Sequence, residues 1–333
     1  MKIVVRMPNW VGDAVMALPA LESLRRNDPR SEIWTAGPAW LKDLLAGTGA
    51  SGFVPLGPSG SLGEMFRQAS ALKALRFEAG LLLTNSFASA FLFRLAGIPQ
   101  RWGYRRDGRG FLLTKGISRP DGGRSGHMVR YYLDLIEGLG LETWPPDIRL
   151  GLRPEDRTRA EEILRTAGLD SARPLIILHP GAAYGPAKRW PAERFAALGR
   201  RFIDVRGAEI ILTGSAEDGP VAEEIAARLG RPEANLAGRT TLGELLGAVS
   251  RAAVFVTNDT GPMHLANALR VPVVAVFGPT DPAVTAPFHP PSAVVKKSAV
   301  CWPCLYRECP YDHRCLTAVS VEDVFAAAAE FLP

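Results

Sequence analysis

The 333-residue chain has no run of about 18 apolar residues, so none of its segments is expected to span a membrane. It also lacks a secretory signal, because the apolar run in KIVVRMP is short and no small-residue cleavage pattern follows it. We therefore expect a cytoplasmic protein. Contact with a membrane surface stays open.

Several catalytic motifs are missing as well. No G-x-G-x-x-G follows the first apolar run, and the chain contains no P-loop sequence, no H-E-x-x-H and no G-x-S-x-G. These absences argue against a standard nicotinamide or P-loop enzyme.

Positive charge is only slightly in excess, since the chain has 39 Lys and Arg and 34 Asp and Glu, for a net charge of +5. Four arginines gather in the stretch RWGYRRDGR, where two aromatic residues are interleaved with them: Arg101, Arg105, Arg106 and Arg109. This stretch is either a solvated loop or a basic patch for an anionic partner.

Short apolar runs alternate with helical patterns along the chain. In the first part we expect strands at 3–6, 31–37 and 80–85, and helices at 13–27, 61–76, 87–96 and 127–140. In the second part we expect strands at 174–180, 208–214, 253–259 and 272–278, and helices at 191–207, 217–230, 241–252 and 261–270. A last helix over 320–332 begins with a capping box of Ser320 and Asp323.

This alternation predicts an α/β chain of two doubly wound domains. The boundary is expected in the proline-rich stretch 144–156, which gives domains 1–150 and 151–333, and the last helix could return to the first domain. Ligands bind at the carboxyl ends of the strands in such sheets, so we expect the active site between the two domains.

Three loops at expected strand ends carry candidate chemistry. In PNWVGD, Gly12 permits a tight turn and Asp13 stands at a helix start, as an N-cap or as an ionised base. In HPGAAYGPAKRWP, two glycines and Lys188 before a helix suit a phosphate, although a surface loop has the same features. In TNDTGPMH, Thr260 and Gly261 open a helix that suits an anion; otherwise Asp259 caps it and His264 packs on the sheet.

The stretches PNWVGDAVMALPAL, PGAAYGPAKRWP and TNDTGPMHLANAL…GPTDP occur in this order. Together they resemble the ADP-heptose:lipopolysaccharide heptosyltransferases of glycosyltransferase family 9. The resemblance covers essentially the whole chain. The first two stretches are more similar to the heptosyltransferase II branch than to heptosyltransferase I.

The resemblance implies a GT-B fold, in which two Rossmann-like domains face a central cleft. The first domain would bind the lipid A–Kdo inner-core acceptor, and the second would bind ADP-heptose. Asp13 would be the general base of an inverting transfer to the inner-core heptose, and Lys188 would contact the diphosphate. A lipid-linked acceptor implies peripheral contact with the cytoplasmic face of the inner membrane, where the four arginines could meet the acceptor or the anionic leaflet. No nucleic acid partner is expected.

The other substrate-binding residues are also implied by the resemblance. Glu217 would hold the ribose, Thr240 and Thr241 would line the adenine, and the Asp259–His264 segment would wrap the diphosphate and sugar. The expected set is Trp10, Gly12, Gly181, Thr213, Glu217, Thr240, Thr241, Asp259, Thr260, Gly261, Met263 and His264.

The chemistry needs no cofactor in this scheme, and the chain has no D-x-D motif for a divalent metal. Other readings remain open: a family member with another donor or acceptor, heptosyltransferase I included, a nucleotide-sugar epimerase, or a non-catalytic nucleotide-binding homologue.

All four cysteines fall within CWPCLYRECPYDHRC, with His313 nearby: Cys301, Cys304, Cys309 and Cys315. Their C-x₂-C start suits a structural zinc or iron–sulfur site, but the full spacing matches no standard zinc finger or ferredoxin. Disulfides and free thiols are the alternatives.

Overall fold

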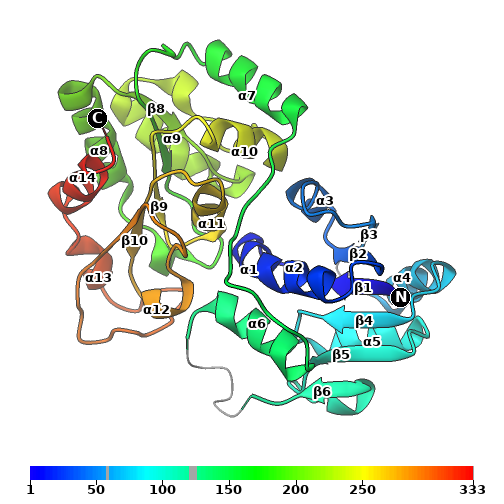
Figure 1. Ribbon diagram of the computed structural model, residues 1–333. Helices are drawn as coiled ribbons and strands as arrows, with labels where there is room; N and C mark the ends of the chain where they lie inside the picture. The colour runs from blue at the N-terminus through cyan, green and yellow to red at the C-terminus, as the bar shows by residue number, and fades with distance from the viewer. Residues whose placement is uncertain (58–59, 120–125, 333) are drawn as a thin grey trace. The chain divides into compact units, whose positions relative to one another are not determined.

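The computed structural model describes residues 1–57, 60–119 and 126–332 (Figure 1). The chain divides into two compact units, Met1–Ile148 and Arg149–Pro333. Within the described ranges, no helix is both long enough and apolar enough to cross a bilayer.

The first unit is built on a six-stranded parallel sheet with the order β3-β2-β1-β4-β5-β6. The order reverses between β1 and β4, and in such a sheet ligands bind at the carboxyl ends of the strands beside that reversal. The loop PNWVGD leaves β1 at this point. The strands are β1 (Lys2–Arg6), β2 (Glu32–Gly37), β3 (Gly52–Pro55), β4 (Ala79–Leu82), β5 (Gln100–Tyr104) and β6 (Lys115–Ile117).

The helices of the first unit differ from the sequence pattern at two points, because the short helix α3 is not among the expected helices and the first expected helix is divided. The helix expected at 13–27 is two helices, because α1 ends at Met16 and α2 begins at Leu18 with Pro19 in its first turn. The helices are α1 (Val11–Met16), α2 (Leu18–Asn27), α3 (Leu41–Leu44), α4 (Leu62–Ala74), α5 (Phe87–Leu95) and α6 (Met128–Gly138), with a 3₁₀ turn at Gly110–Leu112.

The second unit has a five-stranded parallel sheet with the order β11-β10-β9-β7-β8. Here the order reverses between β7 and β9, so the loops after these two strands meet at the ligand-binding edge. The strands are β7 (Leu175–His179), β8 (Glu209–Leu212), β9 (Val254–Asn258), β10 (Val273–Phe277) and β11 (Ser292–Lys296).

Helices cover both faces of this second sheet. Alternate residues of β7 enter different cores: Ile176 and Leu178 pack with α8 (Ala192–Arg206), α9 (Gly219–Leu229) and α14 (Val321–Ala329). Ile177 packs with α7 (Pro154–Thr166), α10 (Leu242–Val249) and α11 (Gly261–Ala268). Two short helices, α12 (Pro282–Thr285) and α13 (Arg314–Thr317), complete the unit. The sheet is therefore doubly wound, as the alternation of apolar runs predicts.

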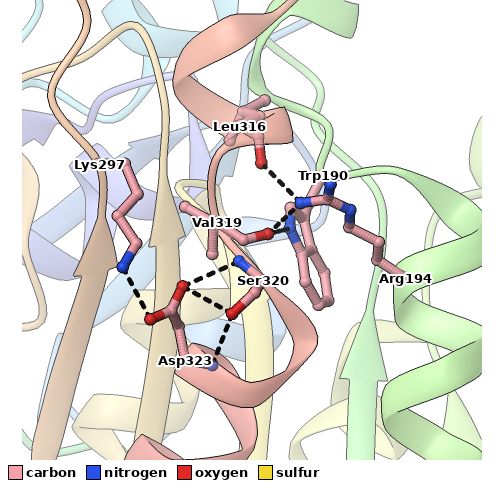
Figure 2. Close-up of polar contacts among 7 residues, drawn as sticks. All are labelled: Trp190, Arg194, Lys297, Leu316, Val319, Ser320 and Asp323. Carbon is pink, nitrogen blue, oxygen red and sulfur yellow. Dashed lines mark hydrogen bonds and ion pairs between the residues drawn. The ribbon is translucent and has the colours of Figure 1, made fainter.

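The C-terminal segment is tied to the core beside Trp190 (Figure 2). The Trp190 indole donates a 3.1 Å hydrogen bond to the carbonyl of Val319, which also accepts from the guanidinium of Arg194. The following helix α14 has its buried residues Val324 and Ala328 in the core of the second unit, whereas a return to the first domain is the alternative considered from the sequence.

The capping box expected at the start of α14 is present. The Ser320 amide donates to the Asp323 carboxylate at 2.9 Å, and the Asp323 amide donates to the Ser320 hydroxyl at 3.1 Å. Lys297 adds a 2.7 Å ion pair to the same carboxylate. Hydrogen bonds from Lys297 and from the Ser320 amide and hydroxyl lower the pKa of Asp323 to about 2.

We predict that Asp323→Ala and Ser320→Ala each lower the free energy of unfolding by about 1 kcal/mol, because each leaves one backbone amide of the capping box without its partner. The double variant should lose less than the sum of the two, since both residues belong to one motif. Urea unfolding of the three variants measures this coupling. Strictly additive losses would contradict the reciprocal cap.

Candidate functional site

The loops after β7 and β9 are joined by a buried ion pair. Lys188 lies at the end of a 3₁₀ turn (Pro186–Lys188), and its ammonium is 2.5 Å from the carboxylate of Asp259, directly after β9. Both side chains are nearly excluded from solvent, at 11% and 5% exposure. Hydroxyls of Thr280 and Thr285 donate to the same carboxylate at 2.6 and 3.3 Å. Asp259 therefore positions the lysine, a role that its sequence context does not reveal.

The loop that carries Lys188, residues 180–191 between β7 and α8, is called the lysine loop below. Asn258, the last residue of β9, holds this loop to the sheet. Its side-chain oxygen accepts from the Trp190 amide at 3.0 Å, and its side-chain nitrogen donates to the carbonyl of Pro180 at 2.8 Å. The side chain is fully buried. Asn258 is not among the expected site residues, and its only signal in the sequence is a polar amide at the end of an apolar strand.

Helix α11 begins beside this ion pair. Thr260 is its N-cap residue and makes no side-chain cap bond, Gly261 is its first residue, and its first turn carries no acid. Met263 and His264 are buried one turn in. The N-terminus of a helix presents backbone N–H groups and a positive dipole end, so this site suits an anion.

The loop after β8 holds a second buried carboxylate. Asp218 accepts from the amide and the hydroxyl of Ser215 at 3.0 and 2.8 Å and pairs with Arg189 at 3.3 Å. The same carboxylate explains why position 181 is a glycine, because an added Cβ there would lie 2.4 Å from the Asp218 carboxylate. The adjacent Glu217 is exposed. Asp218 thus has a structural role, whereas the Glu217 side chain faces solvent, where a ligand could reach it.

Two threonines of the expected nucleotide site, Thr213 and Thr241, have structural partners. The Thr241 hydroxyl accepts from the Glu244 amide at 3.3 Å in the capping box of α10, next to the half-buried Thr240. Thr213 is buried, and its hydroxyl lies 3.1 Å from the Nδ1 atom of His179.

Asp13 in the first unit is half-buried in the first turn of α1, after the buried Gly12. The N-cap residue is the exposed Trp10, so Asp13 itself is not the N-cap. The hydroxyl of Tyr132 on α6 interacts with the Asp13 carboxylate, chiefly through the charge of the carboxylate and to a smaller extent through a hydrogen bond. Burial, followed by the Asp13 charge, raises the pKa of Tyr132 well above its usual value. Tyr132 thereby orients the carboxylate, and nothing in the local sequence pattern identifies it.

The arginine-rich stretch divides into buried and exposed residues. Arg109 is fully buried, and its guanidinium donates to the carbonyls of Thr84 and Tyr104, at 2.5 and 3.0 Å. The expectation that Arg109 meets an acceptor or a membrane is therefore wrong, because its charge is enclosed in the first unit.

The other three arginines of the stretch lie nearer the surface. Arg101 is half-buried and donates to three backbone carbonyls, while Arg105 and Arg106 are exposed. Of the four arginines, only this last pair is therefore exposed at the surface.

The four cysteines lie around one small cavity of about 10 Å³. None of them forms a disulfide. Among the residues that the structure describes, no three or more Cys, His, Asp or Glu side chains have their ligand atoms already gathered as in a metal site.

We predict that the buried His179 makes stability pH-dependent. Burial lowers the pKa of His179 to about 4, against the opposing effect of Asp218, from a usual value of 6.5. As the pH falls from 6.5 toward 4, the unfolded chain gains a proton that the folded chain does not bind, so stability is lost in this window. Between pH 7 and pH 5 the loss is about 2 kcal/mol. Urea unfolding of the wild type and His179→Asn measures it, and equal pH slopes would contradict the assignment.

The chain matches the family described as glycosyltransferase family 9 (heptosyltransferase) over residues 65–314. It is 34% identical over 308 residues to lipopolysaccharide heptosyltransferase 2 of Escherichia coli (strain K12), with 89% of this chain and 88% of the relative covered. It is 33% identical over 313 residues to lipooligosaccharide heptosyltransferase 2 of Haemophilus influenzae, with coverage of 89% and 88%.

Solved structures of the same family also superimpose on this chain. The structure of E. coli ADP-heptose lps heptosyltransferase II superimposes with a TM-score of 0.86 at 30% identity, covering 100% of this chain and 98% of that one. A glycosyl transferase family 9 structure from Veillonella parvula gives 0.88 at 25% identity, covering 99% and 97%. The GT-B fold prediction is thereby confirmed. The chain belongs to glycosyltransferase family 9, the heptosyltransferases, and is a glycosyltransferase.

Proposed function

We propose that this chain transfers heptose from ADP-heptose to the inner-core heptose of lipopolysaccharide, as a heptosyltransferase II. The observation that supports donor binding is the buried Lys188–Asp259 pair beside the start of α11, at the strand-order reversal of the second sheet. The Lys188 ammonium and the N-terminus of α11, which both suit an anion, lie next to each other there. The heptosyltransferase II relatives, named for ADP-heptose and lipopolysaccharide, support the choice of donor and acceptor.

The second unit would hold the donor. The Lys188 ammonium and the backbone N–H groups at the start of α11 would neutralise the diphosphate, whose negative charge grows as ADP departs. Such preorganised electrostatic stabilisation is often the largest catalytic contribution. The exposed Glu217 carboxylate would accept hydrogen bonds from ribose hydroxyls.

The first unit would activate the acceptor. Asp13, oriented by the Tyr132 hydroxyl, would take the proton from an acceptor hydroxyl as its oxygen attacks the anomeric carbon opposite ADP. One C–O bond forms, the bond to ADP breaks, and the configuration inverts. The lipid-linked acceptor would bring the protein to an anionic membrane surface, where the exposed Arg105 and Arg106 are suitable cations.

We predict that Asp13→Asn lowers kcat at least about 10²-fold, because the amide keeps the shape of the side chain but cannot accept the proton. ADP affinity should be unchanged, since the donor belongs to the second unit. Transfer from ADP-heptose to defined truncated inner-core acceptors, with calorimetric ADP binding, measures both effects.

Tyr132→Phe is the matched companion of this variant. It keeps the base and removes only its orienting hydrogen bond, so its loss of kcat should be smaller. Near-normal turnover of Asp13→Asn on a heptose-terminated core would remove Asp13 as the base. Transfer only to a Kdo-terminated core would instead favour heptosyltransferase I.

We predict that Lys188→Ala weakens ADP binding about tenfold or more, because one cation is lost from the diphosphate site. The same variant should unfold more readily, since the Asp259 carboxylate is left buried without its counter-charge. The double variant Lys188→Met/Asp259→Asn separates the two effects. It should recover Tm without recovering ADP affinity, and recovery of both would contradict a direct diphosphate contact.

A further inference from the structure

The segment 297–313 between β11 and α13 has no regular secondary structure, yet it is hydrogen-bonded to the lysine loop. The carbonyl of Arg307 accepts from the Ala187 amide at 3.1 Å, next to Lys188. The Tyr184 hydroxyl donates to the carbonyl of Leu305 at 2.8 Å, and Arg307 Nε donates back to the Tyr184 carbonyl at 2.9 Å. These bonds come from the stretch between the second and third cysteines.

Gly185 shows how close this approach is. An added Cβ at Gly185 would lie 2.3 Å from the carbonyl oxygen of Arg307, and the glycine has a φ of 152°. The lysine loop therefore passes directly against the backbone of residue 307, where a side chain at position 185 would not fit.

The same segment also holds the loop that supports Asp259. Backbone amides of Cys304 and Leu305 both donate to the Pro279 carbonyl at 3.1 Å, and the Trp302 indole donates to the Thr280 carbonyl at 3.0 Å. Thr280 in turn donates its hydroxyl to Asp259. Both members of the buried ion pair thus depend on where residues 302–307 lie.

An irregular segment needs an anchor to hold such contacts. Fixing a residue costs about 1–2 kcal/mol of backbone conformational entropy. Most residues of 301–314 are exposed or half-buried, so hydrophobic burial repays little of that cost. The feature that these residues share is the set of four thiols around one cavity, whose lining also includes Ala187 and Pro279.

The chemistry of the lining suits a metal ion. Four thiolates are a common tetrahedral set for Zn²⁺ in closed structural sites. The cavity, at about 10 Å³, has room for about one water-sized sphere, which suits a single ion. Three of the four cysteines lie on the irregular segment, and metal binding would require their side chains to rotate and gather the sulfur atoms. The guanidinium of Arg314, which also lines the cavity, would offset part of the negative charge of a four-thiolate zinc centre.

We propose that Cys301, Cys304, Cys309 and Cys315 bind one structural Zn²⁺, and that this site clamps residues 302–307 against the lysine loop. Binding converts four thiols to thiolates and releases their protons to solvent. The clamp has no part in the transfer chemistry. Its consequence for donor binding depends on the proposed role of Lys188, whereas the metal site itself does not.

The first test is the metal content of the full chain, purified without chelator from medium containing both zinc and iron. We expect about one zinc per chain, and Cys304→Ser/Cys309→Ser should lose it. Glu308→Gln, an exposed neighbour of Cys309 that does not line the cavity, is the matched control and should keep the zinc. Stoichiometric iron, absorbance of an iron–sulfur cluster, or a mass deficit of two hydrogens per cysteine pair would each overturn the zinc site.

The second test addresses the clamp. Zinc should be removed from the wild type with a chelator and then restored, with ADP affinity and protease sensitivity near Lys188 measured at each step. We expect ADP binding to weaken several-fold, cleavage to increase, and both to recover with zinc. Bound zinc whose removal changes neither measurement would overturn the clamp. If the zinc-loaded chain fails to bind ADP at all, the proposed function fails, while metal content and protease sensitivity still decide the clamp.

Discussion

The ion pair between Lys188 and Asp259 is the constraint around which the second unit is organised. Two charges 2.5 Å apart and nearly excluded from water are costly unless further partners satisfy them. Thr280 and Thr285 supply hydroxyls to the carboxylate, and the Tyr184 ring lies 4.7 Å from the ammonium. Loops that follow three different strands must therefore keep their positions for one pair to persist.

Sheet topology explains why these loops meet. β7 and β9 are neighbours although β8 lies between them in sequence, so residues 188 and 259 come together across 71 positions. Asn258 then locks the two strand ends by bonding to both sides of the lysine loop. The same reversal of strand order places the Asp13 loop at the edge between β1 and β4 in the first unit. In each unit the candidate site residues therefore follow the carboxyl ends of strands beside the reversal of strand order.

Sequence patterns predict the buried parts of this architecture best. Strands such as β7, β9 and β10 are continuous apolar runs, as expected for parallel strands covered on both faces. β5 was missed because it includes Arg101 and Trp102 near the sheet edge, and α7 because its prolines and charges resemble a linker. The motif residues were found, but their partners were not. Tyr132 and Thr280 act through contacts that no local spacing encodes.

The acidic partner of Lys188 has a physical use in a site for an anion. A lone buried ammonium would be costly in the unliganded protein. Asp259 holds Lys188 in place, and two hydroxyls already satisfy part of the carboxylate. When a diphosphate arrives, the ammonium can share its hydrogen bonds between the two anions without moving far. The electrostatic field that the proposed reaction needs is then in place before the donor binds, which is the condition for stabilising charge on a departing ADP.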